Sequence, residues 1–185
     1  NDLLASRALD DKIAAFISCE VLKRVKERSS NGVYFAATVG EETTGRGAIF
    51  STVDVDPTCA IALDVGGSSD VAYRNNFTRE VSLGKGGMLT YSAYSNKILD
   101  KKLEEASREK NIPVQHVVEV SKTWTDFDQV YKNNKGIPAT LISIPLRYMH
   151  SAVEVCSLKD VEYIVELLVE FICSLTENDT FDPFK

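Results

Sequence analysis

Short apolar runs alternate with amphipathic segments along most of this chain, and that alternation limits the possible folds more than any other feature. Continuous apolar runs predict strands buried on both faces. They cover residues 33–39, 59–65, 113–120 and 139–145. Apolar residues spaced three and four apart predict helices over residues 9–28, 95–110 and 158–175, with shorter helical segments near 48–53 and 125. Buried strands alternating with helices predict an α/β fold, a three-layer α/β/α sandwich around a mostly parallel sheet.

The first predicted helix has an apolar face. It consists of Ile13, Phe16, Ile17, Val21 and Val25. No internal repeat, low-complexity tract or linker interrupts the pattern, so residues 1–185 are expected to form one domain.

Composition excludes several partners. The net charge is −6 with scattered Lys and Arg, and no apolar run approaches the roughly 20 residues that span a membrane, so neither nucleic acid nor a membrane is expected as a partner. The four cysteines are far apart and lie among apolar neighbours, which predicts reduced, buried thiols. No secretion signal is visible, so we expect a cytoplasmic location. The chain lacks a starting Met and begins almost directly with a helical pattern, which suggests that sequence precedes it.

Acidic residues follow the predicted strands. Glu41 and Glu42 come directly after the first strand, Asp64 lies near the end of the second, and His150 follows the last. Ligands of open α/β sheets bind beyond the carboxyl ends of strands, so these side chains are expected to converge there, together with Asp10 at the start of the first helix. Carboxylates held close repel one another, and divalent cations relieve that repulsion.

Each of these residues also has an ordinary structural interpretation. Asp10 can cap a helix, Glu41 and Glu42 can be solvated loop charges, and His150 can be a structural histidine. Asp64 is harder to explain in this way, because it ends an apolar run where burying a charge is costly. Their joint placement favours a metal site.

Five ordered motifs carry a family resemblance over nearly the whole chain. They are R-A-L-D-D-K, V-G-E-E-T-T-G-R-G-A, A-I-A-L-D-V, L-G-K-G-G and I-P-L-R-Y-M-H-S. Together they resemble the dinuclear metallo-aminopeptidases that form tetrahedral (TET) particles, a glutamyl- and leucyl-aminopeptidase-like family of which some members are labelled endoglucanases or cellulases. The resemblance implies a zinc-peptidase-like fold and the release of N-terminal residues from peptides.

The resemblance also implies a role for each matched residue. Asp10 matches the carboxylate that bridges two metal ions, Asp64 a ligand of the first metal, and Glu42 and His150 ligands of the second. Glu41 matches the general base that takes a proton from water. Oxygen and imidazole ligands suit zinc or cobalt, so two such ions are implied for a complete site.

This chain departs from the family pattern in three respects. Its first metal lacks a matching histidine, because His116 lies inside a predicted strand and is interpreted as structural, so the first site is expected to be incomplete. Nothing corresponds to the family's N-terminal segment or its inserted assembly domain, which implies a truncated catalytic domain whose parent is a homo-oligomer. The family loop G-G-T-D-A is replaced by K-T-W-T-D-F-D, in which Asp126 is a weaker candidate for substrate binding.

Three functions therefore remain open at this stage. The first is an aminopeptidase acting on peptide substrates, and the second is an inactive fragment or paralogue that keeps the fold as a binding or assembly module. Metal-dependent release of an amino acid from a dipeptide separates these two. A glycoside hydrolase is the third, and it requires paired carboxylates across a sugar cleft and activity without a metal.

Overall fold

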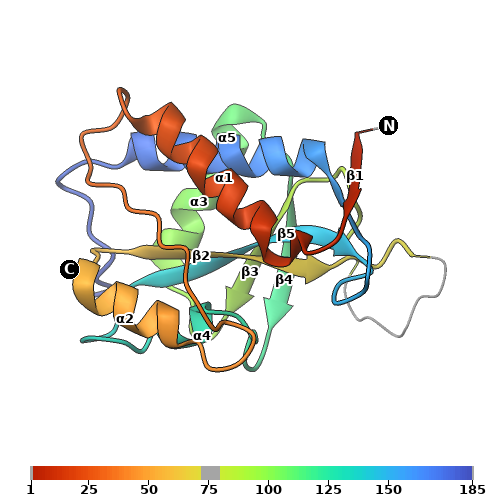
Figure 1. The fold of residues 1–185 in the computed structure, drawn as a ribbon. Coiled ribbons are helices and arrows are strands. Elements are labelled where there is room, and N and C mark those ends of the chain that lie inside the picture. The colour runs from red at the N-terminus through yellow and green to blue at the C-terminus, as the bar shows by residue number, and fades with distance from the viewer. Residues whose placement is uncertain (1, 72–79, 185) are drawn as a thin grey trace.

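The computed structural model describes residues 2–71 and 80–184, which form a six-stranded sheet covered by helices (Figure 1). The strands are β1 (Leu3–Ser6), β2 (Ala60–Gly67), β3 (Gly87–Ser92), β4 (Val114–Glu119), β5 (Ala139–Arg147) and β6 (Glu154–Ser157). The helices are α1 (Leu9–Val25), α2 (Arg46–Val55), α3 (Lys97–Lys110), α4 (Phe127–Val130) and α5 (Leu158–Ser174). None of the helices in the described ranges is long and apolar enough to cross a membrane.

The sheet is mixed. Its main path runs β1-β6-β5-β3-β4, and β2 pairs with β5. Among the described residues, β2 with β5 and β3 with β4 are parallel, while β1 with β6, β5 with β6 and β3 with β5 are antiparallel. The predicted α/β class is confirmed, but the sheet is less parallel than expected. One reason is that only a short loop joins β5 to β6, and parallel neighbours require a long crossover.

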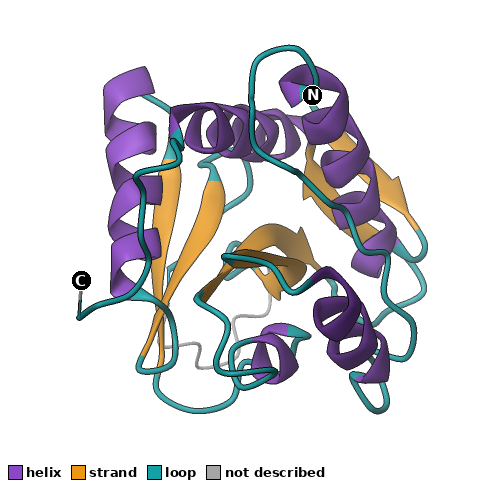
Figure 2. Ribbon diagram, turned by 90° about the vertical axis from the view of Figure 1, so that its left-hand side faces the viewer, coloured by secondary structure: helices purple, strands orange, loops and turns teal. Residues whose placement is uncertain are grey.

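Helices cover both faces of the sheet, which gives the three predicted layers (Figure 2). The helices α1, α3 and α5 pack on one face, where they enclose the larger apolar core with Ile142, Ile144 and Leu146 of β5. The helices α2 and α4 pack on the other face, where Phe127 joins a smaller core with Leu141. Successive residues of β5 thus enter different cores, as the twofold period of a strand requires.

Most predicted helices and strands are confirmed, and their caps explain where some begin. The side chain of Asn96 accepts hydrogen bonds from the N–H groups of Ile98 and Leu99 in the first turn of α3, and the side chain of Ser157 accepts one from the Lys159 N–H at the start of α5. The sequence did not predict β1, β3 or β6. The first and last of these have four residues each, too few to show a period.

Two sequence predictions are wrong. Residues 33–39 do not form a buried strand, because Tyr34 is 73% exposed, Val39 is 76% exposed and the segment joins no ladder. A strand requires a hydrogen-bonding neighbour as well as an apolar sequence. On α1, Phe16 is 53% exposed, because the buried stripe repeats every four residues from Ile13 through Ile17, and Phe16 is turned about 100° from Ile17.

The cysteines match the prediction only in part. All four are free thiols, and Cys156 is buried, but Cys59 and Cys173 are half-buried and Cys19 is exposed.

The L-G-K-G-G motif is a loop that requires glycine. Gly86 has a φ of +98°, and a Cβ there would lie 1.9 Å from the carbonyl oxygen of Pro113. Its N–H and that of Gly84 donate to the buried carboxylate of Asp160 at the start of α5, each at 2.7 Å. The motif therefore anchors the beginning of β3 to α5.

We expect Gly86→Ala to lower the free energy of unfolding by about 2 kcal/mol or more, because the added methyl group meets backbone atoms. Urea unfolding followed by circular dichroism measures this. Gly67→Ala is the matched control, since a Cβ at Gly67 meets nothing within 4 Å and the change should stay within about 0.5 kcal/mol. Equal stability of the two variants would show that the close approach at Gly86 is unimportant.

Candidate active site

The structure brings the predicted acidic residues together at one edge of the sheet. Asp64 lies near the carboxyl end of β2, beside Ser143 of the parallel strand β5, and His150 lies on the loop that follows β5. Asp10 comes from the first turn of α1, and Glu42 from the turn before α2. Four segments far apart in the sequence thus supply this acidic cluster.

The cluster contains two groups of side chains that could each hold a metal ion. One is Asp10, Glu42 and His150, and the other is Asp10, Asp11 and Asp64; within each group the potential ligand atoms lie within 4.8 Å of one another. Asp10 belongs to both groups. The Nε2 atom of His150 is 3.1 Å from a carboxylate oxygen of Asp10, and the His150 side chain remains 63% exposed. The first group is therefore open to solvent.

Glycines shape the turn that presents the two glutamates. Gly40 has a φ of +75°, and its carbonyl oxygen accepts hydrogen bonds from the N–H groups of Thr44 and Gly45, both at 2.8 Å. Gly47 lies so close to Val39 that a Cβ would be 2.4 Å from the Val39 nitrogen. The chain therefore folds back on itself at this turn, which leaves Glu42 exposed and Glu41 half-buried.

Sequence reasoning missed Asp11 and Glu154 at this site. Asp11 follows Asp10 through a cis peptide bond and accepts a hydrogen bond from the Ala14 N–H at 3.3 Å. The adjacent pair Asp10-Asp11 was the signal, although only its first member was assigned a role. Glu154 gave no signal, because it stands in a four-residue strand that periodicity did not predict.

Burial and mutual repulsion raise the pKa of the clustered carboxyls. Burial, with further repulsion from Glu41, raises the pKa of Asp64 to about 8. Burial, with repulsion from Asp64, raises the pKa of Asp11 to about 9. Burial also raises the pKa of Asp10, and the charge of Glu42 adds to that effect. Around neutral pH Asp64 and Asp11 therefore tend to stay protonated, although carboxyl groups are normally charged there. A bound cation would stabilise their charged forms.

Glu41 lies within the electrostatic reach of the cluster but in neither ligand group. Burial raises the pKa of its carboxyl to about 7, with repulsion from Asp126 and Glu42 as the next causes. A carboxyl with a pKa near neutrality can both accept and release a proton.

Asp126 approaches the same region from the loop before α4. One of its oxygens accepts a hydrogen bond from the Thr38 hydroxyl, and the other, Oδ1, is buried with no partner among the described residues. His116, in contrast, lies on β4, stacks on Tyr91 and places Nδ1 3.2 Å from Glu104. It belongs to neither ligand group.

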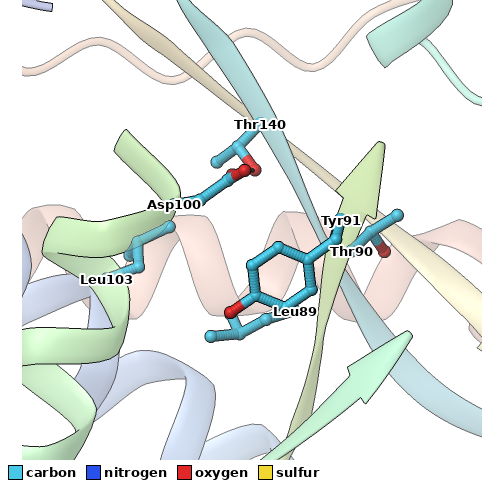
Figure 3. Close-up of a pocket in the computed structure, with 6 residues that line it drawn as sticks. All are labelled: Leu89, Thr90, Tyr91, Asp100, Leu103 and Thr140. Atoms are coloured by element: carbon cyan, nitrogen blue, oxygen red, sulfur yellow. Dashed lines mark hydrogen bonds between the residues drawn. The ribbon is translucent and has the colours of Figure 1, made fainter. Parts of the chain in front are cut away.

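Buried carboxylates elsewhere in the fold accept hydrogen bonds from neighbouring donors. Asp100 accepts hydrogen bonds from the Thr140 hydroxyl at 2.6 Å and from the Ser95 hydroxyl at 2.7 Å, and Figure 3 shows its carboxylate directed at Thr140. Asp160 accepts two backbone N–H groups in the same way. The acidic cluster differs, because carboxylate oxygens of Asp10, Asp11 and Asp64 lie within 4.8 Å of one another and their charges repel. The donor set of carboxylate oxygens and one imidazole nitrogen fits divalent metal ions such as zinc or cobalt.

Comparison with known proteins identifies relatives of this chain. The sequence pattern of the M42 glutamyl aminopeptidase family matches residues 1–167. The chain belongs to this family. Its M42 relatives include the lysyl aminopeptidase of Pyrococcus furiosus, which is 31% identical over 179 residues, 97% of this chain and 51% of the relative. These relatives are peptidases and therefore hydrolases.

Two solved structures show the same fold. The aminopeptidase APDkam598 from Desulfurococcus kamchatkensis matches with a TM-score of 0.87 at 31% identity, covering 94% of this chain and 50% of that one. The TET aminopeptidase from a marine sediment Thaumarchaeota archaeon matches with a TM-score of 0.83 at 31% identity, covering 95% and 50%. This M42 chain thus spans about half the length of the relatives it matches.

Proposed function

We propose that this chain is the catalytic portion of a metal-dependent aminopeptidase that releases N-terminal residues from peptides. The observation that carries the proposal is the pair of ligand groups that share Asp10, with Glu41 beside them. Membership of the M42 family and the names of its relatives support the same activity.

Five residues would hold the metal ions. Asp10 would bridge the two metal sites. Asp64 and Asp11 would complete the first site, and Glu42 and His150 would complete the second. The side with Asp64 lacks a nitrogen ligand within this chain, so we propose that a further ligand comes from outside it. Two divalent ions, zinc or cobalt, would supply an acidified water and polarise the carbonyl of the scissile peptide bond.

The protein's own side chains would move the proton. Glu41 would accept a proton from the attacking water and deliver it to the leaving amine nitrogen, and its raised pKa suits both steps. Asp126 would bind the substrate, because its buried Oδ1 has no partner among the described residues and can accept a hydrogen bond from a bound peptide.

The complete protein would contain more than residues 1–185. We propose that the chain lacks an N-terminal segment and an inserted assembly domain, and that the complete protein is a homo-oligomer, as its likeness to a TET aminopeptidase suggests. The four free thiols suit the reducing cytoplasm.

The test is hydrolysis of an alanyl or lysyl aryl-amide by the complete protein, before and after treatment with a chelator. We expect hydrolysis that is lost on chelation and restored by zinc or cobalt. The matched substrate is the same aryl-amide with its amino group acetylated, which an aminopeptidase should leave intact. Chelator-resistant hydrolysis, or equal cleavage of the acetylated substrate, would refute the proposal.

A further inference from the structure

A single buried carboxylate joins the two segments that carry Asp10 and His150. Glu154 is 2% exposed, and its two oxygens accept hydrogen bonds from two different backbone N–H groups. The Asp10 N–H lies 3.1 Å from Oε2, and the His150 N–H lies 3.0 Å from Oε1. The side chains of the same two residues meet each other at 3.1 Å.

The position of Glu154 follows from the order of the strands. It is the first residue of β6, which lies between β1 and β5 in the sheet. Asp10 comes four residues after the end of β1, and His150 comes three residues after the end of β5. The segments that follow β1 and β5 leave the sheet on either side of Glu154. Its carboxylate therefore reaches the backbones of both segments.

The loop that carries His150 needs such support. Tyr148 and His150 have φ values of +61° and +62°, in the left-handed region that non-glycine residues rarely adopt. Arg147 fixes the start of the loop through an ion pair with Asp70, at 3.1 Å and 2.6 Å. The hydrogen bond from His150 to Glu154 fixes the part of the loop that presents the imidazole.

We infer that Glu154 is a positioning residue that sets the spacing of two metal ligands, Asp10 and His150, through their backbones. The inference rests on the proposed function and extends it to a residue that is not itself a ligand. Asp10 belongs to both ligand groups and His150 to one, so displacement of their backbones weakens both metal sites. Mutation of groups that orient metal ligands typically lowers metal affinity by about 10- to 100-fold.

The experiment is zinc titration of the metal-free complete protein and its Glu154→Gln and Glu154→Asp variants, by calorimetry or competition with a chelating dye. Glutamine keeps the length but offers one acceptor oxygen, whereas aspartate keeps two oxygens and the charge on a shorter stem. We expect both variants to bind zinc about 10- to 100-fold more weakly. The matched control is Asp160→Asn, which alters another buried carboxylate that accepts two backbone N–H groups, and it should keep the wild-type affinity.

Four outcomes of the zinc titration contradict the inference. Wild-type affinity in Glu154→Gln would show that the two hydrogen bonds do not position the ligands. Weak binding in Glu154→Gln but wild-type binding in Glu154→Asp would assign the effect to charge alone. Equal weakening by Asp160→Asn would assign it to general loss of structure. A wild-type protein that binds no zinc would refute the proposed function itself, and this inference with it.

Thermal unfolding of each metal-free variant shows whether it is folded. If neither Glu154 variant folds, the wild-type protein decides the question through amide hydrogen exchange measured by NMR. The amides of Asp10 and His150 should then be protected in the metal-free state, and exchange at the rates of an unstructured chain would overturn the inference.

Discussion

Replacing Glu41 with glutamine in the complete protein is expected to lower kcat by about 100- to 10,000-fold while zinc stoichiometry and KM change little. Glutamine has nearly the same shape as glutamate but cannot take a proton from water. Glu41 lies in neither ligand group, so its loss should leave the metal sites intact. Steady-state kinetics together with metal analysis of the same sample measures both quantities.

The neighbouring residue provides the matched control for this prediction. Glu42→Gln makes the same chemical change one position away, but Glu42 belongs to a ligand group with Asp10 and His150. We expect this variant to bind zinc more weakly and to regain activity in part when zinc is raised. If the two variants behave alike, or if Glu41→Gln retains full kcat, the division of roles between the adjacent glutamates is wrong.

The metal-free protein is expected to lose stability as pH rises from about 5 to 8, and zinc is expected to reverse that loss. The pKa values of Glu41, Asp64 and Asp11 in the folded chain are about 7, 8 and 9, above the ordinary values near 4 that hold when the chain is unfolded. Between these limits the folded state binds more protons than the unfolded state, so stability falls as pH increases. This loss of stability is absent below about pH 4 and complete above about pH 9.

Zinc counteracts this loss of stability because it binds the charged carboxylates of the folded state. At 1,000 times its dissociation constant a ligand adds about 4 kcal/mol, which corresponds to roughly 8 to 16 °C in Tm for a chain of this size. Thermal unfolding with and without zinc at pH 5 and pH 8 measures both effects.

Two variants locate the source of the pH dependence. Asp64→Asn removes one titrating group and should flatten the pH dependence of the metal-free protein. Asp54→Asn changes an exposed acid on α2 and should leave it unaltered. A metal-free protein whose stability rises steadily from pH 5 to pH 8 would contradict the prediction.

Different kinds of information identified different parts of the site. Glu41, Glu42 and Asp64 stood out in the sequence because charged residues ended apolar runs. Asp64 and His150 lie near or beyond the ends of β2 and β5, as the rule for α/β sheets predicts, whereas Glu42 reaches the cluster from a turn, because residues 33–39 form no strand. Asp11 and Glu154 could not be found in this way, because their importance depends on what their oxygens face in space. A buried carboxylate in a short strand looks like any other glutamate until its two backbone donors are known.

The sequence by itself determined the α/β class, the helices and the strands β2, β4 and β5, because the spacing of apolar residues reflects which faces are buried. The tertiary structure decided what depends on partners. Residues 33–39 are apolar enough for a strand but pair with none in the described chain, and three antiparallel pairings make the sheet mixed. Strand pairing and the contact between Asp10 and His150 both join segments that are far apart in the sequence. The local sequence pattern does not show which distant segments will meet.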